Sequence, residues 1–150
     1  MIMRNTLIQL LDWLRVKLTK VDDELPVLEL LYFDVQGIAE SIRNTLIYGE
    51  IDFTHTKMSK EDIQELKEST FSYGQSPVLK IGDECIAQSN AILRYTGKLV
   101  RAYPQNNIVN AAIVDHWIDL HTEFMFPLSL NMFPTQYGLQ WSEEYCEKHR

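Results

Sequence analysis

The stretch YGQSPVLKIGDECIAQSNAILRY, residues 73–95, contains the signals that decide the fold. A proline opens a short apolar run, a Gly-Asp pair follows that run, and a Gln-Ser pair stands where a helix can begin. The Gly-Asp pair predicts a β-hairpin between strands at 77–81 and 84–87. The apolar spacing of residues 90–99 predicts a helix that directly follows the hairpin.

The residues before this stretch alternate between strand and helix signals. The apolar run 27–33 predicts a strand buried on both faces, and residues 37–48 have the apolar spacing of a helix. Residues 51–56 alternate like a second strand, and a short helix follows with Ser59 as its N-cap and Asp62 three residues on. The predicted order is β-α-β-α-β-β-α. The fold class is therefore α/β with a mixed sheet, because the first crossover needs parallel strands and the hairpin needs antiparallel ones.

Residues 1–26 form a distinct amphipathic extension. Its leucines follow the spacing of one helix face, at Leu7, Leu10, Leu11, Leu14 and Leu18. Basic residues exceed acidic ones over its first twenty positions. Polar residues interrupt any apolar core and no small-residue cleavage site follows, which argues against a secretory signal. A helix packed on the body, an organelle presequence and an artefact of gene modelling remain as alternatives.

The composition changes near Pro104, where we place the boundary between segment 27–104 and segment 105–150. Residues 108–120 have the spacing of a helix with a buried face. The following stretch FMFPLSLNMFPTQYGLQW is rich in aromatic residues, and Pro127 and Pro134 are expected to interrupt the helix. The second segment therefore predicts the start of an all-helical domain.

The composition excludes several classes of function. A net charge of −7 and a pI near 5.0 argue against binding to nucleic acid or to an anionic membrane surface. No stretch is long and apolar enough for a membrane span. Cys85 and Cys146 have no metal-ligand or disulfide-framework spacing, and His116 and His121 do not share a helix face. We therefore expect no metal and a cytoplasmic location.

Physical reasoning predicts a site for a small peptide-like anion at one edge of the sheet. A helix N-terminus attracts a carboxylate, and Ser89 as N-cap and the Gln88 amide can bind the same group. A cis Ser76-Pro77 bond would turn the Ser76 backbone towards an extended peptide. Tyr32 ends the first strand at the edge where ligands usually bind in such sheets.

Two longer strings then resemble a known family. LLYFDVQGIAESIRNTLIYG, followed by YGQSPVLKIGDECIAQSNAILRYTGKL, resembles the N-terminal half of cytosolic glutathione transferases of the tyrosine type, which include the mu, pi and sigma classes. The resemblance covers residues 27–104 and implies a thioredoxin-like domain. It continues into the first helix of the family's all-helical second domain.

The resemblance implies a role for each matching residue. Tyr32 stands at the catalytic tyrosine, whose hydroxyl donates a hydrogen bond to the glutathione sulfur. Gln75 and Ser76, which precede the cis-proline position Pro77, would clamp the cysteinyl part of glutathione with their backbone. The pair Gln88 and Ser89 would bind the γ-glutamyl carboxylate.

The sequence also departs from the family. Ile38 stands where several classes have an arginine that binds ligand or orients the tyrosine. Gln64 and Glu68 stand where the family has a Trp and a Lys that bind the glycine carboxylate, and Lys67 is the nearby replacement. The segment after Pro104 is less than half as long as the family's helical domain, which indicates a fragment, an alternative product or a truncated gene model.

Two classes of function follow from the resemblance. The first is a glutathione transferase that adds the glutathione thiolate to a hydrophobic electrophile in detoxification, or isomerises a lipid peroxide as some sigma-type relatives do. The resemblance implies glutathione as co-substrate and a homodimer. The alternative is a non-catalytic module for dimerisation or scaffolding, or an inactive form. Tyr32 with Gln88 and Ser89 favours the enzyme, whereas Ile38 and the short second segment favour the alternative.

Overall fold

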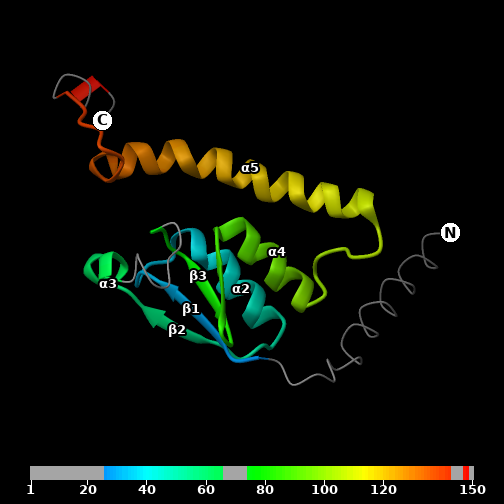
Figure 1. Ribbon diagram of the computed structural model, residues 1–150. Helices are drawn as coiled ribbons and strands as arrows, with labels where there is room; N and C mark the ends of the chain where they lie inside the picture. Colours follow the sequence, from blue (N-terminus) through cyan, green and yellow to red (C-terminus); the bar gives the residue numbers. More distant parts are fainter. Residues whose placement is uncertain (1–25, 66–73, 143–146, 149–150) are drawn as a thin grey trace. The chain divides into compact units, whose positions relative to one another are not determined.

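The computed structural model describes residues 26–65, 74–142 and 147–148 (Figure 1). The predicted amphipathic extension, apart from Pro26, and Lys67 lie outside the described residues. The chain divides into two compact units, Met1–Gln105 and Asn106–Arg150.

The first unit contains a four-stranded mixed sheet. Its strands are β1 (Leu28–Tyr32), β2 (Thr54–Lys57), β3 (Val78–Ile81) and β4 (Glu84–Ala87), in the order β2-β1-β3-β4. The strand β1 pairs in parallel with β2 and antiparallel with β3, and β3 pairs antiparallel with β4. The predicted order and mixed sheet are confirmed.

The strand β2 begins later than predicted. The backbone N–H of Ile51 donates to the Leu46 carbonyl at 3.0 Å, so this residue closes the end of the preceding helix. Residues 51–53 consequently lead into the strand, which starts at Thr54. The predicted strand at 51–56 therefore begins three residues too early and ends one residue too early.

Helices cover the sheet at the predicted places. A 3₁₀ turn η1 (Gly37–Ala39) leads into α2 (Glu40–Tyr48), and α3 (Lys60–Glu65) and α4 (Ser89–Leu99) follow. Ser59 caps α3 as predicted: the Asp62 N–H donates to Ser59 Oγ at 3.1 Å, and the Ser59 N–H donates to Asp62 Oδ2 at 2.7 Å. The hydrogen bond from the Ser59 N–H, followed by one with the Ser59 side chain, lowers the pKa of Asp62.

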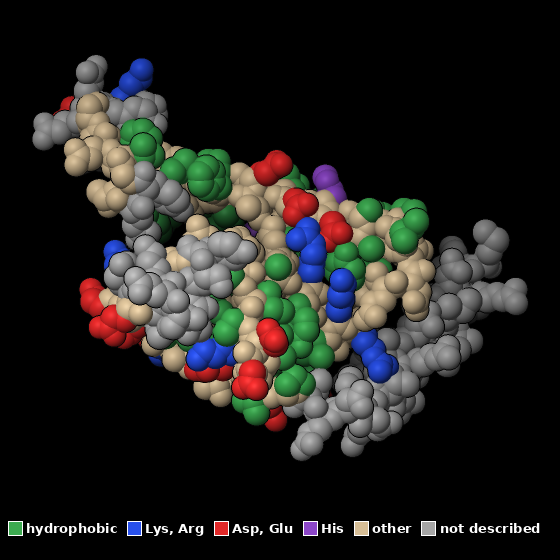
Figure 2. All heavy atoms as spheres, viewed as in Figure 1, with side chains coloured by type: hydrophobic (Ala, Val, Ile, Leu, Met, Phe, Trp, Pro, Cys, Tyr) green, Lys and Arg blue, Asp and Glu red, His purple; other side chains and the backbone are tan. Residues whose placement is uncertain are grey.

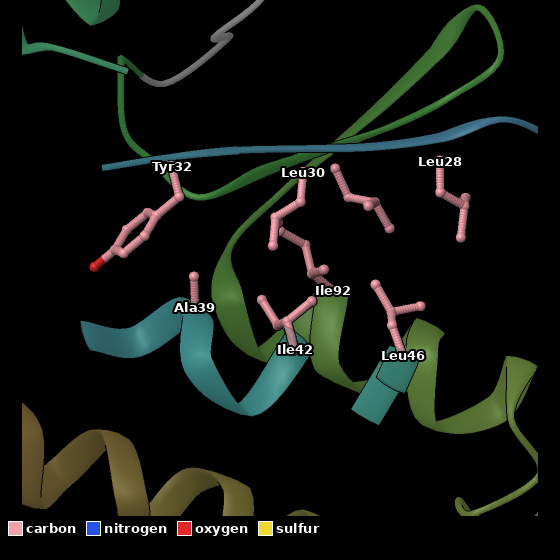
Figure 3. Close-up of a cluster of buried hydrophobic side chains, with 8 residues drawn as sticks. Leu28, Leu30, Tyr32, Ala39, Ile42, Leu46 and Ile92 are labelled. Atoms are coloured by element: carbon pink, nitrogen blue, oxygen red, sulfur yellow. The ribbon is translucent and has the colours of Figure 1, made fainter. Parts of the chain in front are cut away.

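The core lies between β1 and the helices α2 and α4 (Figure 3). Its main cluster consists of Leu28, Leu30, Tyr32, Ala39, Ile42, Leu46, Leu79 and Ile92. Alternate residues of β1 point to one face of the sheet. Leu31 instead joins a smaller cluster with Met58 and Val78. Both faces of β1 are therefore buried, as the apolar run predicted.

The second unit is dominated by one long helix, α5 (Ile108–Met132). Asn107 caps it, because its side-chain oxygen accepts from the N–H groups of Val109 at 3.1 Å and Asn110 at 3.0 Å. The predicted interruption at Pro127 is wrong. The helix continues past this proline, and the Phe133 N–H still donates to the Ser129 carbonyl at 2.8 Å.

The predicted buried face of α5 is also wrong. The helix has no buried residue, and apolar side chains such as Trp117 and Phe124 are 63% and 69% exposed. Figure 2 shows hydrophobic side chains at the surface along this helix. Besides α5, the described part of the second unit contains the short 3₁₀ turn η3 (Pro134–Tyr137) and no strand, so it offers no opposing layer. Among the described helices, none has the length and apolar character to cross a membrane.

Candidate functional site

Tyr32 is the last residue of β1 and combines a buried ring with a hydroxyl directed away from the core cluster (Figure 3). Only 7% of the residue is exposed, and its ring packs edge-on against Phe33 with 5.5 Å between centroids. Its carbonyl accepts from the Met58 N–H at 2.9 Å, which continues the pairing of β1 beyond β2. The strand pairing thus holds the backbone of Tyr32, while its ring is packed and its hydroxyl points away from the core cluster.

Gly37 lies directly against the Tyr32 hydroxyl. Its φ is +47°, a left-handed conformation that favours glycine. A Cβ built at this position would lie 2.5 Å from the Tyr32 hydroxyl oxygen. The first turn after β1 therefore approaches the phenol closely only because residue 37 has no side chain.

Arg43 reaches the same turn from α2. Its Nη2 donates to the carbonyls of Val35 at 2.7 Å and Gln36 at 2.8 Å, and its Nε donates to Glu40 Oε2 at 2.9 Å. Its guanidinium carbon lies 5.9 Å from the centre of the Tyr32 ring. This distance is within the range of a cation–π contact.

An acidic side chain follows Tyr32 by two residues. Asp34 accepts a hydrogen bond from Lys57 Nζ at 2.9 Å. This hydrogen bond lowers the pKa of Asp34, and the charges of Lys57, His55 and Arg43 act in the same direction. The carboxylate is therefore matched by positive charge beside the end of β1.

The hairpin brings a second group of predicted residues to the end of the sheet where β1 ends. Leu31 pairs with Val78 and Val78 pairs with Ala87, so the start of β3 and the end of β4 adjoin the C-terminal end of β1. The Ser76-Pro77 bond is cis, as predicted. Gln88 Nε2 donates to Gln75 Oε1 at 3.3 Å, which links the segment before β3 to the segment after β4.

The predicted cap of α4 is wrong by one residue. Ser89 is the first residue of the helix, and Gln88 occupies the N-cap position without a side-chain capping bond. The reason is the left-handed backbone of Gln88, whose φ is 74° and which turns the chain from β4 into the helix. Gln88 is exposed and Ser89 is half-buried.

The remaining residues named from the sequence either lie outside the described residues or have another place in the first unit. Lys67 and Glu68 lie outside the described residues, and the Gln64 side chain is not described. Ile38 packs against the core cluster. Cys85 is exposed on β4. In the described ranges, no group of His, Cys, Asp and Glu residues could hold a metal ion.

Sequence reasoning missed Gly37 and Arg43 as parts of the site. A glycine soon after a buried strand was a usable signal for a close approach of the backbone. Arg43 gave a weaker signal, because its position three residues after Glu40 is also typical of a surface ion pair.

Comparisons with known proteins agree with this geometry. Residues 25–98 match the family described as "Glutathione S-transferase, N-terminal domain". Glutathione S-transferase 2 of Onchocerca volvulus is 37% identical over 102 residues, which are 64% of this chain and 47% of that protein. Glutathione S-transferase 2 of Caenorhabditis elegans is 33% identical over 110 residues, or 73% of this chain and 57% of that protein.

Solved structures are similar over the same region and beyond it. A Nu-class glutathione S-transferase from Haemonchus contortus has a TM-score of 0.59 and 30% identity, covering 65% of this chain and 47% of that one. A glutathione S-transferase from Ascaris lumbricoides has a TM-score of 0.67 and 29% identity, covering 79% and 57%. The chain spans about half the length of the relatives that it matches. With its mixed sheet, its cis-proline and these matches, the chain belongs to the glutathione S-transferase family.

Proposed function

We propose that this chain acts as a glutathione transferase in which Tyr32 stabilises the glutathione thiolate. One observation supports this above the others: the Tyr32 hydroxyl is held against Gly37 at the sheet edge to which the cis-proline segment and Gln88 also belong. A free thiol has a pKa of about 8.5, and each unit of depression corresponds to about 1.4 kcal/mol in favour of thiolate. A phenol hydrogen bond to sulfur supplies part of that preference.

The hairpin and α4 would bind the peptide part of glutathione. In this proposal, the Ser76 backbone pairs with the cysteinyl residue, next to Gln75 and Pro77. Gln88 and Ser89 bind the γ-glutamyl carboxylate. The N–H groups and dipole at the N-terminus of α4 attract this carboxylate, and no acidic residue in the first turn opposes it. Lys67 is assigned to the glycyl carboxylate, following the resemblance alone.

The thiolate would attack the electrophilic atom of a hydrophobic small molecule, forming a thioether bond. In a substitution, the bond to the leaving group breaks and its electron pair departs with that group. In an addition, the π bond of the electrophile breaks, its electron pair moves to the neighbouring atom, and that atom takes a proton from solvent. A role in detoxification, a homodimer and a cytoplasmic location belong to the same proposal. They follow from the resemblance to the family alone rather than from a contact within this chain.

A non-catalytic binding or scaffold module is the second candidate. Ile38 supports it, because this apolar side chain packs against the core and adds no charge to the site. Such a module would keep the fold while losing the ability to bind glutathione or activate its thiol.

Calorimetric titration of the purified chain with reduced glutathione near neutral pH tests the proposal. We expect one binding site per chain, and thioether formation with a panel of electrophiles. Tyr32→Phe should keep the fold, because the ring remains in the core, and should reduce conjugation at least about tenfold through the lost hydrogen bond. A folded chain that binds no glutathione would instead support the scaffold candidate.

A further inference from the structure

The Arg43 side chain is far less exposed than is usual for an arginine, a residue that is mostly exposed in proteins. Its side chain is only 12% exposed, and Glu40 is its ion-pair partner at 2.7 Å. Within the part of the chain that the structure describes, its Nη1 is buried without a hydrogen-bond partner. Enclosing a guanidinium in this way costs free energy, because one N–H group has given up water without replacement.

The Tyr32 ring offers partial compensation for that cost. Its centre lies 5.9 Å from the guanidinium carbon. A cation over an aromatic face is stabilised by the negative charge density of the ring, and more strongly when water is excluded. The same attraction restricts the motion of the Tyr32 ring, so the contact stabilises the Arg43 charge and positions the ring as well.

Arg43 also fixes the turn that bounds the hydroxyl. The carbonyls that it binds, those of Val35 and Gln36, belong to the two residues immediately before Gly37. Gly37 in turn lies against the Tyr32 hydroxyl oxygen. One side chain from α2 therefore contacts the face of the phenol and anchors the backbone next to its hydroxyl.

We propose that Arg43 is the positioning residue for Tyr32, and that it fixes both the ring and the direction of the hydroxyl. The residue touches no reacting atom and acts through the phenol. Its catalytic consequence rests on the proposed function, whereas its effect on Tyr32 does not. Arg43→Gln removes both contacts, and Arg43→Lys keeps a cation but loses the planar fork that binds two carbonyls.

The functional test compares affinities for reduced glutathione and S-methylglutathione. Their ratio reports the thiol-specific contact with Tyr32 and cancels losses common to both ligands. We expect Arg43→Gln to reduce this preference about 3- to 10-fold, in line with a desolvated cation–π contact. Arg43→Lys should restore part of it. In a Tyr32→Phe background, Arg43→Gln should change the ratio no further.

Lys57→Gln is the matched control. It removes the same charge close to the end of β1, but Lys57 is 61% exposed and pairs with Asp34. We expect the ratio to change less than twofold, as is usual for an exposed pair. An equal loss in Lys57→Gln, or an unchanged ratio in folded Arg43→Gln, would overturn the proposal.

A measurement without ligand separates this inference from the proposed function. Tyrosine labelled with carbon-13 at Cζ gives one resonance per ring, and Tyr32→Phe identifies that of Tyr32. We expect this resonance to move in Arg43→Gln and Arg43→Lys but not in Lys57→Gln. If the wild type binds no glutathione, the proposed function fails, and a displaced Tyr32 resonance still supports the positioning role. An unmoved resonance in the folded Arg43 variants contradicts that role, whatever the ligand result.

Discussion

The apolar side chains of the first unit and those of α5 are in opposite situations. Leu30, Ile42 and Ile92 are fully enclosed between a sheet and two helices, whereas Ile113, Trp117 and Phe124 are exposed on a single helix. Both sets have helical or strand spacing in the sequence. Periodicity therefore shows which face of an element is apolar, but only an opposing layer makes that face part of a core.

Two isoleucines allow the sharpest test of this comparison. Ile42 is fully buried and Ile113 is 52% exposed, so the same truncation to alanine removes the same atoms in two environments. We expect Ile42→Ala to lower the free energy of unfolding by about 2–5 kcal/mol, through lost burial and a cavity. Ile113→Ala should change it by less than about 0.5 kcal/mol. Urea unfolding measures both, and similar losses would mean that α5 is packed as firmly as the first unit.

Gly37 tests how closely the first unit is packed around the phenol. We expect Gly37→Ala to cost about 1–3 kcal/mol, because alanine is strained at positive φ and its Cβ would meet the Tyr32 hydroxyl. Gly82→Ala is the matched control, since Gly82 has a φ of +59° and nothing within 4 Å of the added Cβ. Thermal unfolding and glutathione titration should both distinguish the pair. Equal effects would show that backbone strain alone is responsible.

The cap of α3 tests a polar contact at the surface of the same unit. We expect Ser59→Ala to cost about 1 kcal/mol, because the Asp62 N–H loses its acceptor. Lys60→Ala, one residue on and exposed, is the control and should have little effect. Chemical unfolding measures both variants. A neutral Ser59→Ala would mean that the short helix contributes nothing to the unit's stability.

The smallest expected effect concerns acid sensitivity. The pKa of Glu29 is lowered, and the largest cause is the hydrogen bond from Thr56. Burial acts in the opposite direction, and the hydrogen bond and charge of Lys80 lower the pKa further. A carboxylate with a lowered pKa stabilises the fold above its ordinary pKa of 4.5, and this stabilisation is lost as the pH falls through the folded value.

Thr56→Val removes that hydrogen bond while keeping a branched side chain. We expect it to cost about 0.5 to 1 kcal/mol at neutral pH. The cost should shrink below pH 4.5, where protonation removes the same stabilisation from the wild type. Urea unfolding of the wild type and of Thr56→Val, at neutral pH and below pH 4.5, measures this cost. A cost that stays constant in acid would assign the loss to packing instead.

The sequence predicted the first unit better than the second for a physical reason. Short-range signals, such as the turn at Gly82 and the cap at Ser59, report contacts between neighbouring residues, and these expectations were confirmed. The extent of α5 depends on whether the helix tolerates Pro127, which composition does not reveal. Whether its apolar face is buried depends on other elements, so periodicity alone could not settle it.

The candidate site likewise contains some features that were predictable from local sequence patterns and some that were not. Tyr32 and the cis bond before Pro77 were predictable because they carry a recognisable local pattern. The contacts of Arg43 with the Tyr32 ring and with the Val35 and Gln36 carbonyls connect different elements, and a single sequence does not reveal such a meeting.

The order of the strands has a further consequence for self-association. In the described sheet, β2 and β4 are the outer strands, and each is only four residues long. Exposed Lys57 and Glu84 place a charged side chain on each of these two strands. Short, charged edge strands resist the addition of a strand from another chain. Copies of this unit should therefore associate through side chains rather than by extending one continuous sheet.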